Sequence, residues 1–149
     1  MSDSKERILA RQSAMQAIYQ WQLTGYDLSE IERQFVEEHG LGNADVGYFN
    51  VLLHEVPKRL DVIDAALKEF VDRAISDIDP VERALLRIGT FELMFRPEVP
   101  FKDVLNECIN LTKEYGAHHS HKYINGILDR IAHKTRAAEI AALGKKRRY

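Results

Sequence analysis

Aromatic rings and cationic side chains lie close together near residues 115–123 of this 149-residue chain. Tyr115 and Tyr123 supply the rings, and His118, His119 and Lys122 supply groups that carry or can acquire positive charge. Such a mixture suits unpaired RNA, because bases stack on rings while cations meet phosphates. The same spacing also fits tyrosines that only cap the rim of the core and cations that only keep the surface soluble. Mixed charged surfaces are common, so the spacing by itself favours this second interpretation.

A second group of cations lies near the start of the chain. Arg7 and Arg11 are four residues apart, so a helix would place them on one face, and Lys5 lies two residues before Arg7. We expect these three residues to extend a basic patch that includes residues 115–123. The expectation requires that the first helix lies beside the last ones.

The sequence offers no set of residues for catalysis or for a metal. It contains no glycine-rich phosphate loop, no CxxC pair and no nucleophile elbow. Cys108 falls on the apolar face of its predicted helix, which indicates a packed core thiol. His118 and His121 have a spacing that two metal ligands can share, but a zinc site needs three or four ligands. We therefore predict no catalytic residue, no metal site and no cofactor.

Composition limits the functions further. The net charge is −2 although 30% of the residues are charged, so any contact with RNA must use a local patch. A single cysteine cannot form an internal disulfide, and no apolar run reaches the ~18 residues of a membrane span. The sequence thus predicts a cytoplasmic protein with no membrane partner.

Helical periodicity dominates the elements that must position these side chains. A first helix is predicted from Ser4 to about Leu23, and Asp79-Pro80 is a typical helix opener. We predict an all-α fold with an N-terminal half at about 4–75 and a C-terminal half at about 78–136. Residues 137–149 are predicted to form a flexible basic tail, because the apolar pattern fades there.

Four segments, in this order, resemble the NusB family of transcription antitermination factors. They are Ala14-Met15-Gln16-Ala17-Ile18-Tyr19-Gln20-Trp21-Gln22, the helix that starts at Val81-Glu82-Arg83-Ala84-Leu85-Leu86-Arg87, Val99-Pro100-Phe101-Lys102 with Asn106-Glu107-Cys108-Ile109, and Ser120-His121-Lys122-Tyr123-Ile124-Asn125-Gly126. The resemblance covers roughly residues 5–136.

The resemblance implies about seven helices in two packed subdomains and a protein that is not an enzyme. It also implies binding to boxA RNA of ribosomal RNA transcripts as a heterodimer with NusE, a small-subunit ribosomal protein. This pair would join NusA, NusG and RNA polymerase. By matching, the RNA contacts would be Lys5, Arg7, Arg11, Tyr115, His118, His119, Lys122 and Tyr123. The contacts with the partner protein would be Tyr19, Phe70 and Glu82.

Two departures from the family pattern affect the expected RNA contacts. Ile8 and Leu9 interrupt what is often a denser run of arginines, which predicts weaker attraction to phosphate. His118 and His119 stand where many members carry acidic residues, which removes negative charge from the RNA path.

Two other functions stay open at this point. The chain could be a non-catalytic homodimeric scaffold whose first helix is buried at its own interface. It could also be an RNA-binding module related to ribosomal RNA methyltransferases.

Overall fold

A computed structural model describes residues 4–147 of the chain and the side chains of residues 5–144. Within residues 4–147 every regular element is helical, which confirms the predicted all-α fold. The elements are α1 (Ser4–Thr24), α2 (Leu28–Arg33), a π-helical segment η1 (Gln34–His39), α3 (Val46–Lys58), α4 (Leu60–Lys68), a 3-10 turn η2 (Ile75–Asp77), α5 (Pro80–Phe95), α6 (Phe101–Tyr115), α7 (Ser120–Thr135) and α8 (Ala137–Arg147). None of these helices is long and apolar enough to cross a bilayer.

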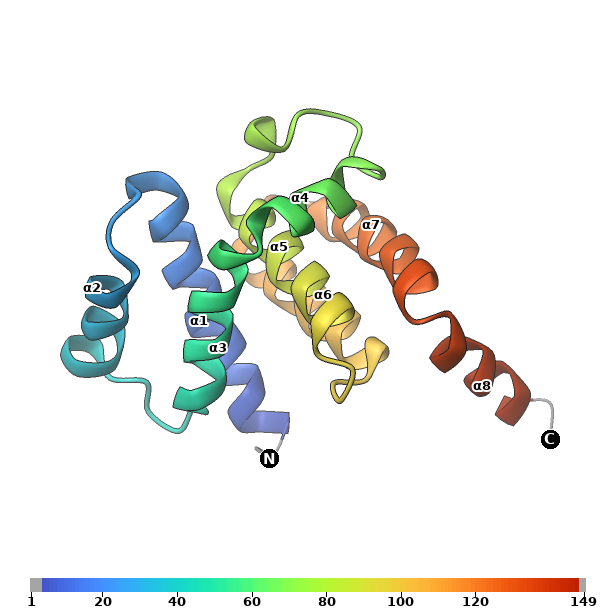
Figure 1. The fold of residues 1–149 in the computed structure, drawn as a ribbon, viewed down its shortest axis with the longest axis horizontal. Helices are drawn as coiled ribbons and strands as arrows, with labels where there is room; N and C mark the ends of the chain where they lie inside the picture. The colour runs from blue at the N-terminus through green and yellow to red at the C-terminus, as the bar shows by residue number, and fades with distance from the viewer. Residues whose placement is uncertain (1–3, 148–149) are drawn as a thin grey trace.

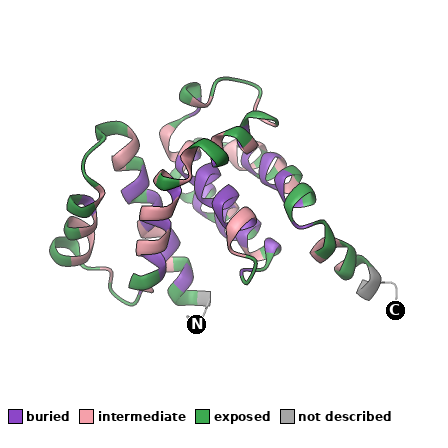
Figure 2. Cartoon of the chain, in the orientation of Figure 1, coloured by how far each residue is buried: buried purple, intermediate pink, exposed green. Residues whose placement is uncertain are grey.

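Helix α5 is the centre of the molecule (Figure 1). It contacts α1, α4, α6 and α7, and every residue from Ala84 to Leu93 is buried (Figure 2). A helix that is buried on all sides needs apolar residues on all sides. The run Ala84-Leu85-Leu86 followed by Ile88-Gly89 meets that requirement.

The two halves of the sequence share one core. α1 packs against both α3 and α5, and α4, which belongs to the first half by sequence, contacts α5 and α7. Buried residues of one continuous cluster come from α1, α3, α4, α5, α6 and α7. The break near residue 76 is therefore a connection over the surface of a common core.

Local signals fix the start and the packing of α5. Asp79 is its N-cap, and its carboxylate accepts hydrogen bonds from the backbone N–H groups of Val81 (3.0 Å) and Glu82 (3.4 Å), as Asp-Pro predicts. At Gly89 an added Cβ would lie 2.9 Å from a methyl group of Leu128 and 3.2 Å from Cys108 Sγ. The glycine therefore allows α5, α6 and α7 to approach closely.

The segment that was expected to be a flexible tail is instead helical over Ala137–Arg147. Ile140 and Leu143 pack against the core, and Glu139 accepts a hydrogen bond from the backbone N–H of Phe101 (2.9 Å), at the start of α6. The contacts described for this helix thus combine two apolar side chains with one carboxylate, which matches the sparse apolar pattern of the sequence. The tail residues Arg148 and Tyr149 lie outside the described part of the chain.

Arg136, just before α8, caps the end of α5. Its buried guanidinium donates hydrogen bonds to four backbone carbonyls at the C-terminal end of α5 and in the turn after it, at distances of 2.8–3.1 Å. These carbonyls belong to Glu92, Leu93, Arg96 and Val99. Two of these carbonyls, those of Glu92 and Arg96, also accept a backbone N–H (both at 3.0 Å), whereas Arg136 adds donors for Leu93 and Val99 as well. One arginine thus supplements the donors at a helix end, where the last carbonyls lack partners within the helix.

Candidate nucleic-acid interface

Five of the predicted RNA contacts lie along the connection between α6 and α7, and we call this set the α6–α7 face. It comprises Tyr115, His118, His119, Lys122 and Tyr123. Tyr115, His118, His119 and Lys122 are exposed, and Tyr123 is half-buried. Four of the five predicted contacts are therefore accessible to solvent around this connection.

The connection itself has an unusual backbone. His119 has φ 70°, in the left-handed region, and is the only non-glycine residue with positive φ among the described residues. Its ring lies close to that of His118, with centroids 3.7 Å apart. A left-handed conformation costs a residue with a Cβ roughly 1–2 kcal/mol, and such residues concentrate at functional sites.

α1 reaches the α6–α7 face at Gln12, whereas its predicted cation Arg7 meets the other end of α6. Gln12 Nε2 of α1 donates a 2.6 Å hydrogen bond to Tyr115 Oη at the end of α6. Arg7 Nη2 pairs with Asp103 Oδ2 at 3.2 Å near the other end of α6. Asp103 and Tyr115 are twelve residues apart on one helix, so these contacts are about 18 Å apart along its axis.

The predicted cations of α1 differ in their access to solvent. Lys5 is exposed, whereas Arg7 is only 8% exposed and already faces the Asp103 carboxylate. Lys5 can therefore reach a phosphate freely, and Arg7 offers only the edge of its guanidinium.

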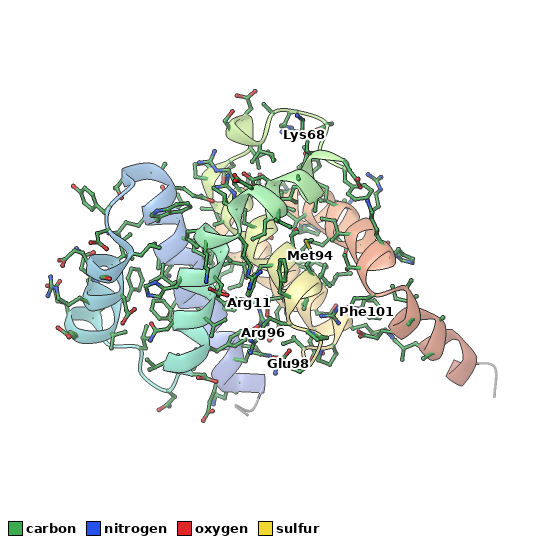
Figure 3. All side chains as sticks on the ribbon, viewed as in Figure 1. Arg11, Lys68, Met94, Arg96, Glu98 and Phe101 are labelled. Atoms are coloured by element: carbon green, nitrogen blue, oxygen red, sulfur yellow. The ribbon has the colours of Figure 1, made fainter. Side chains whose placement is uncertain are left out.

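The prediction that Arg11 contacts RNA is wrong in its geometry, because the side chain is fully buried. Arg11 Nε and Nη2 donate to the two carboxylate oxygens of Glu92 at 2.7 and 2.5 Å, and Nη1 lies 2.8 Å from Glu107 Oε2. Tyr48 Oη donates to the same Glu92 carboxylate at 2.5 Å. Through these contacts Arg11 joins α1 to α5 and α6 from inside. Figure 3 labels Arg11 among the side chains of the molecule.

This buried network contains one guanidinium and two carboxylates. Burial opposes the charge on Arg11, but Glu92 and Glu107 outweigh it and raise the Arg11 pKa. Burial also raises the pKa of Glu107, although Arg11 opposes that shift. Glu92 accepts two hydrogen bonds from the Arg11 guanidinium, whereas Glu107 meets only its Nη1 atom.

Tyr123 is held in place by two residues that were not predicted from the sequence to belong to the site. Its hydroxyl donates to Asp72 Oδ1 at 2.9 Å, and the Arg73 guanidinium lies 4.8 Å from the centre of its ring. Hydrogen bonds from Arg73 and Tyr123 lower the Asp72 pKa to about 2, so the carboxylate stays charged. No periodicity marks these residues, because they follow α4 in the irregular connection to α5.

The predicted partner contacts occupy different environments. Tyr19 is exposed on α1, and beyond it Leu23 (54% exposed) and Tyr26 (57%) extend an apolar strip that was not predicted from the sequence. Glu82 is only 7% exposed in the first turn of α5, so it offers a partner little surface. Phe70 is half-buried and lines a small cavity with Lys122 and Tyr123. The structure therefore brings Phe70 together with residues predicted to contact RNA.

Cys108 is fully buried, and burial raises the pKa of its thiol, which makes it a packed core side chain as predicted. Among the described residues, no group of three or more His, Cys, Asp or Glu side chains is placed to share a metal ion.

The chain is similar to known proteins over most of its length. The model of the NusB family matches residues 9–133. The transcription antitermination protein NusB of Nitrosococcus oceani is 48% identical over 145 residues, which cover 97% of both chains. The NusB protein of Pseudomonas savastanoi pv. phaseolicola is 46% identical over 93% of this chain and 84% of its own length. A crystal structure of the antitermination factors NusB and NusE with double-stranded RNA superposes with a TM-score of 0.79 at 29% identity, covering 86% of this chain and 96% of that one. The chain belongs to the NusB family.

Proposed function

We propose that this protein is a transcription antitermination factor that binds boxA RNA together with a NusE protein. The observation that carries the proposal is the α6–α7 face, where exposed rings and cations lie beside α1. Two findings on relatives support it. Similar proteins are named for transcription antitermination, and the similar solved chain occurs in a complex with NusE and double-stranded RNA.

In this proposal the RNA contacts are Lys5, Tyr115, His118, His119, Lys122 and Tyr123, with Arg7 at the edge. The tyrosine rings stack on unpaired bases, and the lysines attract phosphates. Sequence choice then comes from hydrogen bonds to the splayed bases. The protein acts by binding and carries out no reaction of its own.

The partner contact is proposed for an exposed strip that comprises Tyr19 and Leu23 of α1 and Tyr26 just after it. A NusE protein that covers this strip and touches the same RNA would raise the overall affinity without new RNA contacts on this chain. The resulting pair would join NusA, NusG and RNA polymerase.

A titration of boxA RNA, with and without NusE, tests the proposal. Lys122→Ala and Tyr123→Ala should each weaken RNA binding, with about 5- to 150-fold expected for the tyrosine, because one stacked base contributes about 1–3 kcal/mol. Lys122→Ala should also reduce the salt dependence by about 0.7 in the slope of log K against log salt.

The matched controls are Lys58→Ala and Tyr26→Ala, which remove an exposed lysine of α3 and an exposed tyrosine outside the α6–α7 face. Both should bind RNA alone like the natural protein, and Tyr26→Ala should weaken the contact with NusE. Equal RNA affinity in the natural protein, Lys122→Ala and Tyr123→Ala would reject the proposed surface.

A further inference from the structure

A small cavity lies between the connection that follows α4 and the first turns of α7. Its volume is about 260 Å³. Its lining includes Phe70, Asp72, Lys122, Tyr123, Gly126 and Arg130. This volume is below the roughly 300–1,000 Å³ that is typical of sites for drug-sized ligands, so the cavity has room for one ring-sized group.

Gly126 lines this cavity, and nothing in the packing or the backbone conformation of the chain requires a glycine there. It lies inside α7, where glycine destabilises a helix relative to alanine. An added Cβ at Gly126 would meet no atom within 4 Å, and the residue has no positive φ that would require glycine. Gly89 differs, since there a Cβ would collide with neighbouring side chains. The open space beside Gly126 is therefore not explained by packing within the chain.

The two rings of the cavity are already positioned. Phe70 packs against the core, and Tyr123 is fixed by its hydrogen bond to Asp72 and by the Arg73 guanidinium. A ring that is fixed before its ligand arrives loses little conformational entropy on binding. Such rings suit stacking on a flat group.

The charges around the cavity favour an anionic ligand. Lys122 and Arg130 line it, and Arg73 lies over Tyr123. The one acid in the lining, Asp72, is paired with Arg73 Nε at 2.8 Å. A nucleotide supplies both a flat ring and a phosphate, whereas an aromatic side chain of a protein supplies only the ring.

We infer that this cavity receives one unpaired base of the RNA, which lies over Gly126 beside Phe70 and Tyr123 while Lys122 and Arg130 meet the flanking phosphates. The inference rests on the proposed RNA-binding function and adds to it a defined base pocket. It also assigns Phe70 to the RNA and not to the partner protein.

Substitution of Gly126 tests the pocket. Gly126→Leu should fill it and weaken the binding of boxA RNA by about 5- to 150-fold, the range expected for loss of one stacked base. Gly126→Ala should weaken binding less while its melting temperature stays equal to or above that of the natural protein, because alanine favours the helix. This second variant keeps the test valid if leucine disturbs folding.

Gly144→Ala is the matched control, because Gly144 is also a helical glycine whose added Cβ would meet no atom within 4 Å. It should bind RNA like the natural protein. A series of RNAs with one abasic position each should contain a position at which base removal weakens binding to the natural protein but not to Gly126→Leu.

The outcomes separate the pocket from the wider proposal. If Gly126→Leu binds RNA normally while Tyr123→Ala does not, the pocket is rejected and the RNA face stands. If neither variant differs from the natural protein, both fail. If Gly126→Leu weakens binding to NusE and leaves RNA binding unchanged, the occupant is a protein side chain and the inference is overturned.

Discussion

The burial of Arg11 could have been predicted from the helical period of α1. Ala14, Met15 and Ile18 follow it at intervals of three, four and seven residues, and all three are buried. Arg11 therefore lies on the inner face of its helix. An exposed position was predicted for its charged side chain because its partners, Glu92 and Glu107, are far away in the sequence.

Replacement of Arg11 should destabilise the protein severely. Arg11→Ala would leave the carboxylates of Glu92 and Glu107 buried without a counter-charge, which costs about 3–5 kcal/mol when a buried ion pair loses one member. Arg33→Ala, which breaks an exposed pair with Glu30, should have a far smaller effect, because solvent screens exposed ion pairs. Urea unfolding of both variants measures the difference, and equal stabilities would contradict the structural role of Arg11.

Glu107 should make the protein less stable as the pH rises. Burial raises its pKa above the ordinary value of 4.5, so between 4.5 and the raised pKa the folded state holds a proton that the unfolded state has released. The free energy of unfolding therefore falls with rising pH in this window. A glutamine at this position would not titrate, so Glu107→Gln should gain stability relative to the natural protein as the pH rises above 4.5.

Urea unfolding at a series of pH values from about 4 to 7.5 measures that difference, because all other groups titrate in both proteins. A difference that stays constant with pH, or that has the opposite sign, would show that the ion pair with Arg11 outweighs burial.

At the scale of elements, long-range caps decide how α5 ends. Arg136→Ala would remove a donor from four backbone carbonyls, of which those of Glu92 and Arg96 keep a backbone N–H donor. The loss at Leu93 and Val99 should cost about 2 kcal/mol or more, since each buried group left unsatisfied costs about 1–3 kcal/mol. Arg136→Lys should recover only part of this loss, because lysine lacks the planar fork.

The control is Lys134→Ala, which breaks an exposed ion pair with Glu69 near the same end of α7. Its melting temperature should stay close to that of the natural protein. A similar loss of stability in Lys134→Ala and Arg136→Ala would mean that the effect comes from the end of α7 and not from the capping of α5.

The helices could be predicted to different extents from the sequence. The start of α5 was predictable, because Asp79 and Pro80 act on residues next to them. The helix α8 was not, because Glu139 is anchored by Phe101, thirty-eight residues earlier in the chain. Periodicity reports burial of a helix face, and it does not report a polar anchor supplied from another element.

For the whole molecule, the predicted site depended on segments that are distant in sequence. The meeting of α1 with the end of α6, seen in the Gln12–Tyr115 hydrogen bond, was required by the prediction and is present in the structure. The contribution of Asp72 and Arg73 was not predictable, because only the path of the chain after α4 brings them to Tyr123. Residue types thus indicated the chemistry, and the tertiary path determined which residues take part.

The net charge of −2 gives the molecule as a whole little long-range attraction for RNA. The cations of the α6–α7 face must therefore act at short range. A partner that adds its own contacts to the same RNA compensates for this, which fits the separate positions of the proposed partner strip on α1 and the RNA face.

The capping of α5 and α6 by Arg136 and Glu139 also has a consequence for biosynthesis. A ribosome makes both helices before it makes the two side chains that complete their ends. Until then, the C-terminal end of α5 in the growing chain lacks the hydrogen bonds that Arg136 donates. α1, which packs on α5, therefore cannot complete its packing earlier. Folding of the nascent chain should consequently finish late, in one step, after residue 139 has left the exit tunnel.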